Sequence, residues 1–149
     1  SPKEGVVTKL FRRRSASKMV LIEDVIKLSY RFKDEPGKTE LVDKIANELG
    51  ISNGRVEAAI RTLIGKDLMS RTNGSYILTD DGVKYALRLV RTHRLWETYV
   101  TRENVLDLEH IHPEAEKVEH VLTEDMVDEL DEELGFPEKD PHGSEIPRK

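Results

Sequence analysis

Residues 39–78 read TELVDKIANELGISNGRVEAAIRTLIGKDLMSRTNGSYIL and carry three local patterns in succession. Apolar side chains recur at helical spacing over 41–49 and again over 56–63, which predicts two amphipathic helices joined by a tight turn. Asn73 and Gly74 then lie between two short runs with strand character. Asn-Gly favours a two-residue hairpin because both residues tolerate positive φ. The segment therefore predicts a helix-turn-helix followed by a β-hairpin.

The residues before this segment predict one more helix, because apolar positions recur near helical spacing over 20–32. A helix, a helix-turn-helix and a hairpin with strands over 68–71 and 75–78 are typical of a winged helix-turn-helix. We expect that domain over residues 19–78. The alternative is a small three-helix unit in which the hairpin has no structural connection to the helices.

The second half of the chain is also expected to be helical. Amphipathic patterns over 83–100, 113–122 and 126–134 predict one long helix and two short ones. Two short amphipathic helices at the end of a long one bury little apolar surface alone, so we expect this half to complete its core in a homodimer. The fold class predicted for the whole chain is mainly α.

Charge is distributed unevenly along the 149 residues, although the formal net charge is only -5. Residues 1–18 carry six basic groups and one acidic group, whereas residues 103–140 carry two basic and fifteen acidic groups. The chain has no cysteine, which excludes disulfides and thiolate chemistry. No apolar run approaches the ~20 residues of a membrane span, so we expect a cytoplasmic location for this piece.

Imidazole and carboxylate side chains are grouped at helical spacing in the acidic half. Four of them follow one another at intervals of four, three and one residues, so they project from one side of a helix. Two more stand at i and i+4 in the preceding predicted helix. The two groups are His112, Glu116, Glu119 and His120, and His93 and Glu97. Nitrogen and oxygen donors without thiolate suit manganese, ferrous iron or zinc better than copper(I). The alternative is an acidic helix whose carboxylates are only solvated.

Enzymatic chemistry has little support in the sequence. There is no Ser-His-Asp order, no phosphate-binding loop and no dinucleotide-binding motif. We therefore expect a protein that is not an enzyme and has no small organic substrate. A metal-dependent hydrolase is kept as the alternative of a different class.

Five stretches resemble the diphtheria toxin repressor family of iron- and manganese-dependent transcription regulators. The resemblance extends over nearly the whole chain, from about Leu21 to Pro147. Its most specific parts are the His-Arg-Leu-Trp-Glu and Glu-His-Val-Leu segments at their observed separation. The stretches are Leu78-Thr-Asp-Asp-Gly82, Arg91-Thr-His-Arg-Leu-Trp-Glu97, His112-Pro-Glu-Ala-Glu-Lys-Val-Glu-His-Val-Leu122, Pro141-His-Gly143 and Ile146-Pro147.

The resemblance implies two metal sites that hold a divalent transition metal, Mn²⁺ or Fe²⁺, with Zn²⁺ as a substitute in vitro. His93, Glu97 and His112 match the ancillary site of the family. Glu116, Glu119 and His120 match the primary site, and Asp24 matches the ligand from the first helix. Glu116 is typical of manganese-selective members, whereas Lys27 stands where those members have a second carboxylate on the first helix. The choice between iron and manganese, and between one and two metals, therefore stays open.

The resemblance also implies that a metal-loaded dimer binds a double-stranded DNA operator and represses metal uptake. In this mechanism the metal fixes the spacing of the two recognition helices. The residues expected at the DNA are Ser52, Asn53, Gly54, Arg55, Glu57, Ala58 and Arg61 of the recognition helix and Arg71 and Asn73 of the wing. Members of that family typically have small hydroxyl residues in the recognition helix. Glu57 therefore indicates either weak DNA affinity or a divergent operator.

The basic leader over residues 1–18 supports a second function. Its segment Leu10-Phe-Arg-Arg-Arg14 resembles the cytoplasmic exit of a transmembrane helix in metal-uptake permeases of the ABC type that carry a regulator-like C-terminal extension. The alternative function is therefore a metal-sensing domain of a permease, on the cytoplasmic side of the inner membrane, with weak or no DNA binding. A basic arm that contacts DNA phosphates has the same composition. The predicted domains are the leader over 1–18, the winged helix over 19–78, a helical dimerisation and metal-binding domain over 79–140 and a tail over 141–149.

Overall fold

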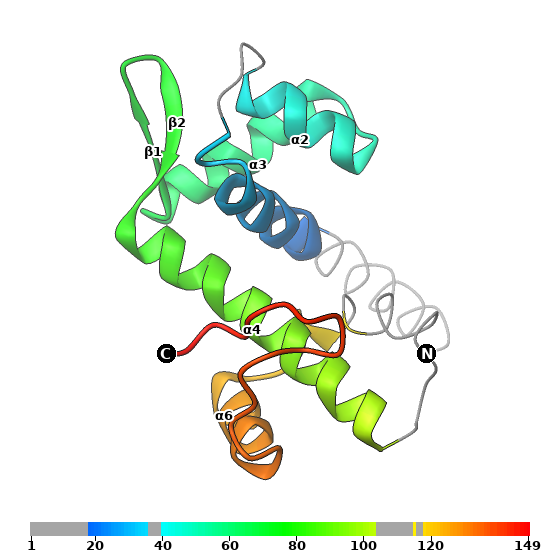
Figure 1. The fold of residues 1–149 in the computed structure, drawn as a ribbon. Coiled ribbons are helices and arrows are strands. Elements are labelled where there is room, and N and C mark those ends of the chain that lie inside the picture. The colour runs from blue at the N-terminus through cyan, green and yellow to red at the C-terminus, as the bar shows by residue number, and fades with distance from the viewer. Residues whose placement is uncertain (1–17, 36–39, 104–114, 116–117) are drawn as a thin grey trace, which may run out of the picture. The chain divides into compact units, whose positions relative to one another are not determined.

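The computed structural model describes residues 18–35, 40–103, 115 and 118–149, and its two compact units meet in sequence between Val83 and Lys84 (Figure 1). The first unit contains a helix over residues 18–31, α2 (Leu41–Leu49), α3 (Asn53–Gly65), β1 (Met69–Thr72) and β2 (Ser75–Leu78). The second contains most of α4 (Asp80–Arg102), all of α6 (Glu124–Glu133) and the C-terminal segment. The predicted domain bounds, 19–78 and 79–140, stay predictions.

Local interactions explain where α2 ends and α3 begins. Gly50 has a left-handed φ of 65°, and its backbone N–H donates to Ala46 O, which closes α2. The Ser52 side chain then accepts a hydrogen bond from the Arg55 N–H at 3.3 Å and caps α3. The predicted pair of helices and the tight turn between them are confirmed.

The predicted hairpin is confirmed as well. Strands β1 and β2 pair antiparallel, with Met69 opposite Leu78. Asn73 and Gly74 have φ values of 51° and 77°, which matches a two-residue turn with two left-handed positions. Strand β1 is displaced by one residue from the predicted range and extends to Thr72.

The core of the first unit forms from the inward faces of its three helices and one strand residue. Val25 and Ile26 are fully buried on the first helix, Ile45 on α2, and Val56 and Ile60 on α3. Met69 at the start of β1 is also buried, and α3 contacts both α2 and β1 (Figure 1). The predicted winged helix-turn-helix is therefore confirmed for this part of the chain.

The start of α4 is fixed by a close backbone approach. Thr79 Oγ1 accepts a hydrogen bond from the Gly82 N–H at 3.0 Å and donates one to Asp67 O at 2.7 Å. A Cβ atom at Gly82 would overlap the Leu68 carbonyl. Glycine is required here because the first turn of α4 lies directly against the Leu68 backbone, in the link between α3 and β1.

A second apolar cluster holds α4, α6 and the C-terminal segment of the second unit together. Leu95 of α4, Val127 and Leu130 of α6, Leu134 and Ile146 are buried in it. The apolar stripe predicted over 126–134 is shorter than expected, because Met126 is 53 % exposed. The second unit is helical in its main elements, so the mainly α fold class is confirmed.

Ion pairs connect the end of the chain to the same two helices. The Arg148 guanidinium donates to both oxygens of Asp131 at 3.1 and 2.9 Å, and Arg91 of α4 donates to the same carboxylate at 2.9 Å. Asp131 is only 4 % exposed, so its charge is balanced by two guanidinium groups. Among the described residues, no helix is both long enough and apolar enough to cross a membrane.

Candidate metal centre

His93 on α4 lies between two buried glutamates of the second unit. Its Nδ1 atom is 2.8 Å from Glu119 Oε2, and its Nε2 atom is 2.8 Å from Glu97 Oε1. Glu97 is 2 % exposed and Glu119 is 3 % exposed. Carboxylates are rarely buried to this extent unless they are paired or coordinate a metal, so this part of the second unit is a candidate functional site.

These glutamates determine the protonation of His93. Burial alone would lower the pKa of the imidazole, but the hydrogen bonds to Glu119 and Glu97 and the charges of both carboxylates raise it from 6.5 to about 9. At neutral pH the metal-free protein therefore holds an imidazolium at this position. Both of its ring nitrogens donate, one to each glutamate.

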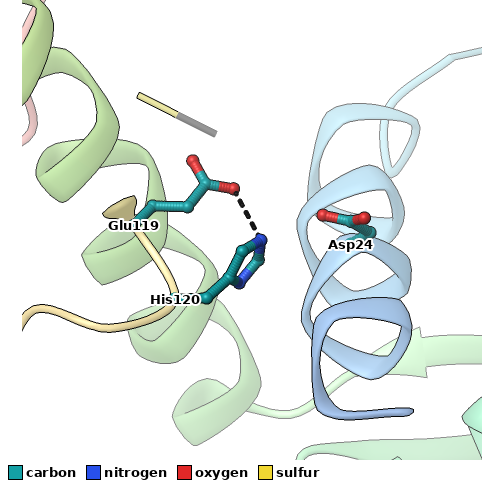
Figure 2. A group of neighbouring side chains, drawn as sticks. All are labelled: Asp24, Glu119 and His120. Carbon is teal, nitrogen blue, oxygen red and sulfur yellow. Dashed lines mark ion pairs between the residues drawn. The ribbon is translucent and has the colours of Figure 1, made fainter. Parts of the chain in front are cut away.

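Each glutamate also contacts a second imidazole through its other oxygen. Glu119 Oε1 is 3.4 Å from His120 Nε2, the pair joined by the dashed line in Figure 2. Glu97 Oε2 is 3.2 Å from His142 Nδ1 in the C-terminal segment. Imidazoles and carboxylates thus alternate from His120 through Glu119, His93 and Glu97 to His142. We call these five residues the imidazole–carboxylate row.

A group of three potential ligands lies at the His142 end of the row. Glu97, Asp140 and His142 each offer one ligand atom, and these atoms lie within 4.8 Å of one another. Asp140 Oδ1 also accepts hydrogen bonds from the N–H groups of His142, at 2.9 Å, and Ser144, at 2.8 Å. This turn holds the carboxylate and the imidazole on the same side of the segment.

Sequence reasoning did not assign Asp140 and His142 as ligands. The Pro141-His-Gly143 stretch is part of the family resemblance, and together with Asp140 before it the stretch places two donors two residues apart. The third donor, Glu97, is 45 residues away from His142 in the sequence. No local spacing rule connects residues so far apart.

Four of the predicted metal ligands lie together in the second unit: His93, Glu97, Glu119 and His120. His112 and Glu116 lie outside the described residues. Asp24 is half-buried on the helix over 18–31 of the first unit and is labelled in Figure 2. Its assignment as a metal ligand stays a prediction.

The donor types fit a divalent transition metal. Within the described residues of the row and of the Glu97, Asp140 and His142 group, every donor is a carboxylate oxygen or an imidazole nitrogen. Such donors suit manganese, ferrous iron and zinc. Buried carboxylates add negative charge where a cation would be held, which increases the attraction for a divalent ion.

The residues predicted at the DNA lie on the first unit, and all of them are exposed. They are Ser52, Asn53, Gly54, Arg55, Glu57, Ala58 and Arg61 around α3, and Arg71 and Asn73 on the hairpin. Asn53 Nδ2 donates to Asp43 Oδ1 at 2.6 Å, which connects the start of α3 to α2. The Arg71 guanidinium lies 5.7 Å from the centre of the Tyr76 ring. A helix whose exposed face carries arginines, beside a hairpin, is typical of a major-groove reader.

A winged helix followed by a helical unit with buried imidazoles and carboxylates defines a class of metal-responsive regulators. Residues 79–148 match the family described as iron dependent repressor, metal binding and dimerisation domain. The predicted resemblance of the chain to the diphtheria toxin repressor family is confirmed.

Two kinds of protein are similar to the chain in sequence. A probable metal transport system membrane protein of Chlamydia trachomatis is 40 % identical over 87 residues, which are 58 % of this chain and 19 % of that protein. The iron-dependent repressor IdeR of Mycobacterium tuberculosis is 31 % identical over 115 residues, 76 % of this chain and 50 % of the repressor. The chain thus spans half the length of the repressor and about a fifth of the membrane protein.

Solved structures of metal-dependent regulators share the fold. The manganese regulator SloR has a TM-score of 0.74 and 32 % identity, covering 85 % of this chain and 59 % of its own. ScaR with bound Zn²⁺ has a TM-score of 0.75 and 32 % identity, covering 86 % and 60 %. These proteins are named as regulators and not as enzymes.

Proposed function

We propose that the chain is a metal-responsive regulatory module that binds Mn²⁺ or Fe²⁺, dimerises and, when metal-loaded, binds a DNA operator in the cytoplasm to repress metal uptake. One observation carries this proposal. Two buried glutamates, Glu97 and Glu119, both contact the His93 imidazole within the segment that matches the iron-dependent repressor family. No catalytic role is assigned to the metal. Its chemistry is that of a divalent cation that cross-links carboxylates and imidazoles.

The primary metal site is proposed at the Glu119 and His120 end of the row, with Glu116 and Asp24 as further ligands. Glu119 and His120 are buried and adjacent in the structure. Asp24 would supply a ligand from the first unit. Metal-dependent DNA binding requires that the metal bind more tightly to the DNA-binding state of the chain than to its other state.

A second cation is proposed at Glu97, Asp140 and His142, which lie close enough to share one ion. The match to the family predicts an ancillary site from His93, Glu97 and His112. The described geometry supports Glu97 as a ligand and adds the two donors of the C-terminal segment. Zinc would occupy either site in vitro because its preferred donors include both imidazole and carboxylate.

The DNA contacts are proposed on the exposed face of α3 and on the hairpin. Arg55, Arg61 and Arg71 would donate to phosphates or to guanine edges. Glu57 is exposed on the same helix and would repel the phosphate backbone unless it accepts from a cytosine amino group. This proposal therefore includes a DNA affinity that is strongly dependent on salt.

A second candidate function has one specific observation in its favour. The similarity to a probable metal transport system membrane protein, 40 % over 87 residues, supports a metal-sensing cytoplasmic domain of a permease. In that function the metal sites are retained, and DNA binding is weak or absent. The two candidates therefore make the same prediction for metal binding and opposite predictions for DNA.

The deciding experiment is an electrophoretic mobility shift at low salt, with and without Mn²⁺. The probe is DNA from the region upstream of the gene that encodes this chain. The repressor proposal expects retardation that requires the metal and is reduced by Arg55→Ala. Lys139→Ala, an exposed basic residue of the second unit, is the matched control and should leave retardation unchanged. Calorimetry with Mn²⁺ accompanies the assay. Metal binding without any metal-dependent retardation would contradict the repressor proposal and favour the permease domain.

A further inference from the structure

The first unit contains a cavity that neither the proposed metal sites nor the proposed DNA contacts use. It is lined by the helix over 18–31 and the residues after it, by α2, by both strands of the hairpin and by the first turn of α4, all within that unit. Its volume is about 290 Å³, close to the lower end of the roughly 300–1,000 Å³ that small-molecule sites occupy. The cavity therefore has room for a small organic ligand.

Apolar side chains from every element around the cavity form one continuous kind of wall. Ser29 also lines it, but the Ser29 hydroxyl is 2.8 Å from Val25 O and donates to that carbonyl, so its hydrogen is already used inside the unit. A ligand against this wall gains free energy mainly from the burial of its own apolar surface. The apolar lining residues are Phe32, Leu41, Met69, Ile77, Leu78 and Val83.

The cavity also has a cation whose charge is poorly balanced. The Lys44 side chain is only 19 % exposed, and its Nζ atom lies 3.9 Å from Glu35 Oε2, too far for a good hydrogen bond. Lys33, the other lysine of the lining, is 44 % exposed and has the Asp34 carboxylate at 3.4 Å and the Tyr30 ring at 4.9 Å. A largely buried ammonium with one loose partner gains more from a new anion than an exposed lysine with two close contacts.

We propose that this cavity binds a small amphipathic monocarboxylate, with its carboxylate on Lys44 Nζ and its apolar tail against the wall. One ammonium matches one negative charge, and the Glu35 carboxylate beside it makes a doubly charged headgroup unfavourable. The ligand is bound and not converted, so it is not a substrate. The inference goes beyond the proposed function and does not rest on it, because the cavity is present in both candidate functions.

The test is calorimetric titration of the full chain with octanoate and with its uncharged analogue octanol. Lys44→Met removes the charge and keeps an unbranched side chain of similar length. We expect it to lower octanoate affinity at least about tenfold, as for the loss of a hydrogen bond to a charged group, and to leave octanol affinity unchanged. Lys66→Met, at an exposed lysine of the same unit outside the cavity, is the matched control and should change neither.

Glu35→Gln tests the same contact in the opposite direction. It removes the carboxylate that competes for Lys44, so octanoate affinity should rise by about twofold, the effect of a partly exposed ion pair. The tail is tested with shorter acids. Each methylene removed between octanoate and butanoate should lower affinity by about fourfold, if the tail is buried in the cavity.

A variant that fills the cavity locates the site. Leu41→Trp should abolish binding of octanoate and octanol alike, with circular dichroism as the check that the variant folds. Two outcomes overturn the inference: octanoate at millimolar concentration gives no binding heat, or it binds Lys44→Met as tightly as it binds the unchanged chain. The second comparison does not depend on how well Leu41→Trp folds.

Discussion

The exposed face of α3 and the buried row of the second unit carry their functional groups in opposite ways. On α3 the polar side chains point into solvent, and the apolar ones, such as Val56 and Ile60, form the core. In the second unit two carboxylates of the row are inside, with Glu97 at 2 % and Glu119 at 3 % exposure. A surface that meets DNA needs accessible donors, whereas a cation site gains from carboxylates that are removed from water.

The largest expected effect is on the buried side of the comparison. Glu119→Ala or His120→Ala should lower Mn²⁺ affinity at least about tenfold, because each substitution removes a proposed metal ligand. Calorimetric titration with Mn²⁺ gives the affinity. Glu129→Ala, an exposed carboxylate on α6, is the control for loss of charge alone. Unchanged binding of both manganese and iron in both variants would show that the ligand assignment is wrong.

A pH dependence should follow from the raised pKa of His93. Because the folded pKa is about 9 and the ordinary value is 6.5, the stabilisation from protonated His93 is complete below pH 6.5 and is lost as the pH rises through about 9. A cation that binds either glutamate offsets the negative charge that raises the pKa of His93. We therefore expect Mn²⁺ binding at pH 7.5 to release roughly one proton and to strengthen toward pH 9. Calorimetry in buffers of different ionisation enthalpy measures the release, and an affinity that is constant over this range would refute it.

A smaller effect is expected on the exposed side. Arg55→Ala should weaken DNA binding by about tenfold if the guanidinium contacts a guanine, and by less if it contacts a phosphate. Mn²⁺ affinity should stay the same, since the side chain is exposed on the first unit. Mobility shifts at two salt concentrations separate the two cases, because loss of a phosphate contact also lowers the salt dependence by about one unit of slope.

The smallest effects are expected on stability, at one helix cap in each unit. Ser52→Ala removes the acceptor for the Arg55 N–H at the start of α3, and Thr123→Ala removes the acceptor for the Met126 N–H at the start of α6. Each should lower the free energy of unfolding by about 1 kcal/mol. Thermal unfolding followed by circular dichroism measures both losses. Substitution by Gly should cost only a few tenths of a kcal/mol, and equal losses for Ala and Gly would argue against a capping role.

The fold of the first unit was predictable because its determinants are local. Gly50, Ser52 and the Asn73-Gly74 turn each act through hydrogen bonds or φ angles within a few residues of themselves. The apolar stripe of the last helix was predicted less well. Periodicity predicts Met126 inside, but it is exposed, whereas Val127, the next residue of α6, is buried.

The candidate site was predictable only in part. The i, i+4 spacing of His93 and Glu97 and the adjacent pair Glu119 and His120 follow from the sequence, and the structure brings all four together. The contribution of Asp140 and His142 could not be predicted, because their partner is on another element. The predicted ligands His112 and Glu116 lie outside the described residues, and those assignments stay predictions.

The sequence by itself determined the helices, the hairpin, the caps and the chemistry of the donors, since these depend on neighbours along the chain. Only the tertiary structure decided that His93 stands between Glu97, four residues away, and Glu119, 26 residues away. It also decided that the C-terminal segment returns to α4, with Ile146 in the apolar cluster and His142 beside Glu97. The physical reason is that burial of the Leu95, Val127 and Ile146 cluster sets which distant donors meet, and no local pattern encodes that packing.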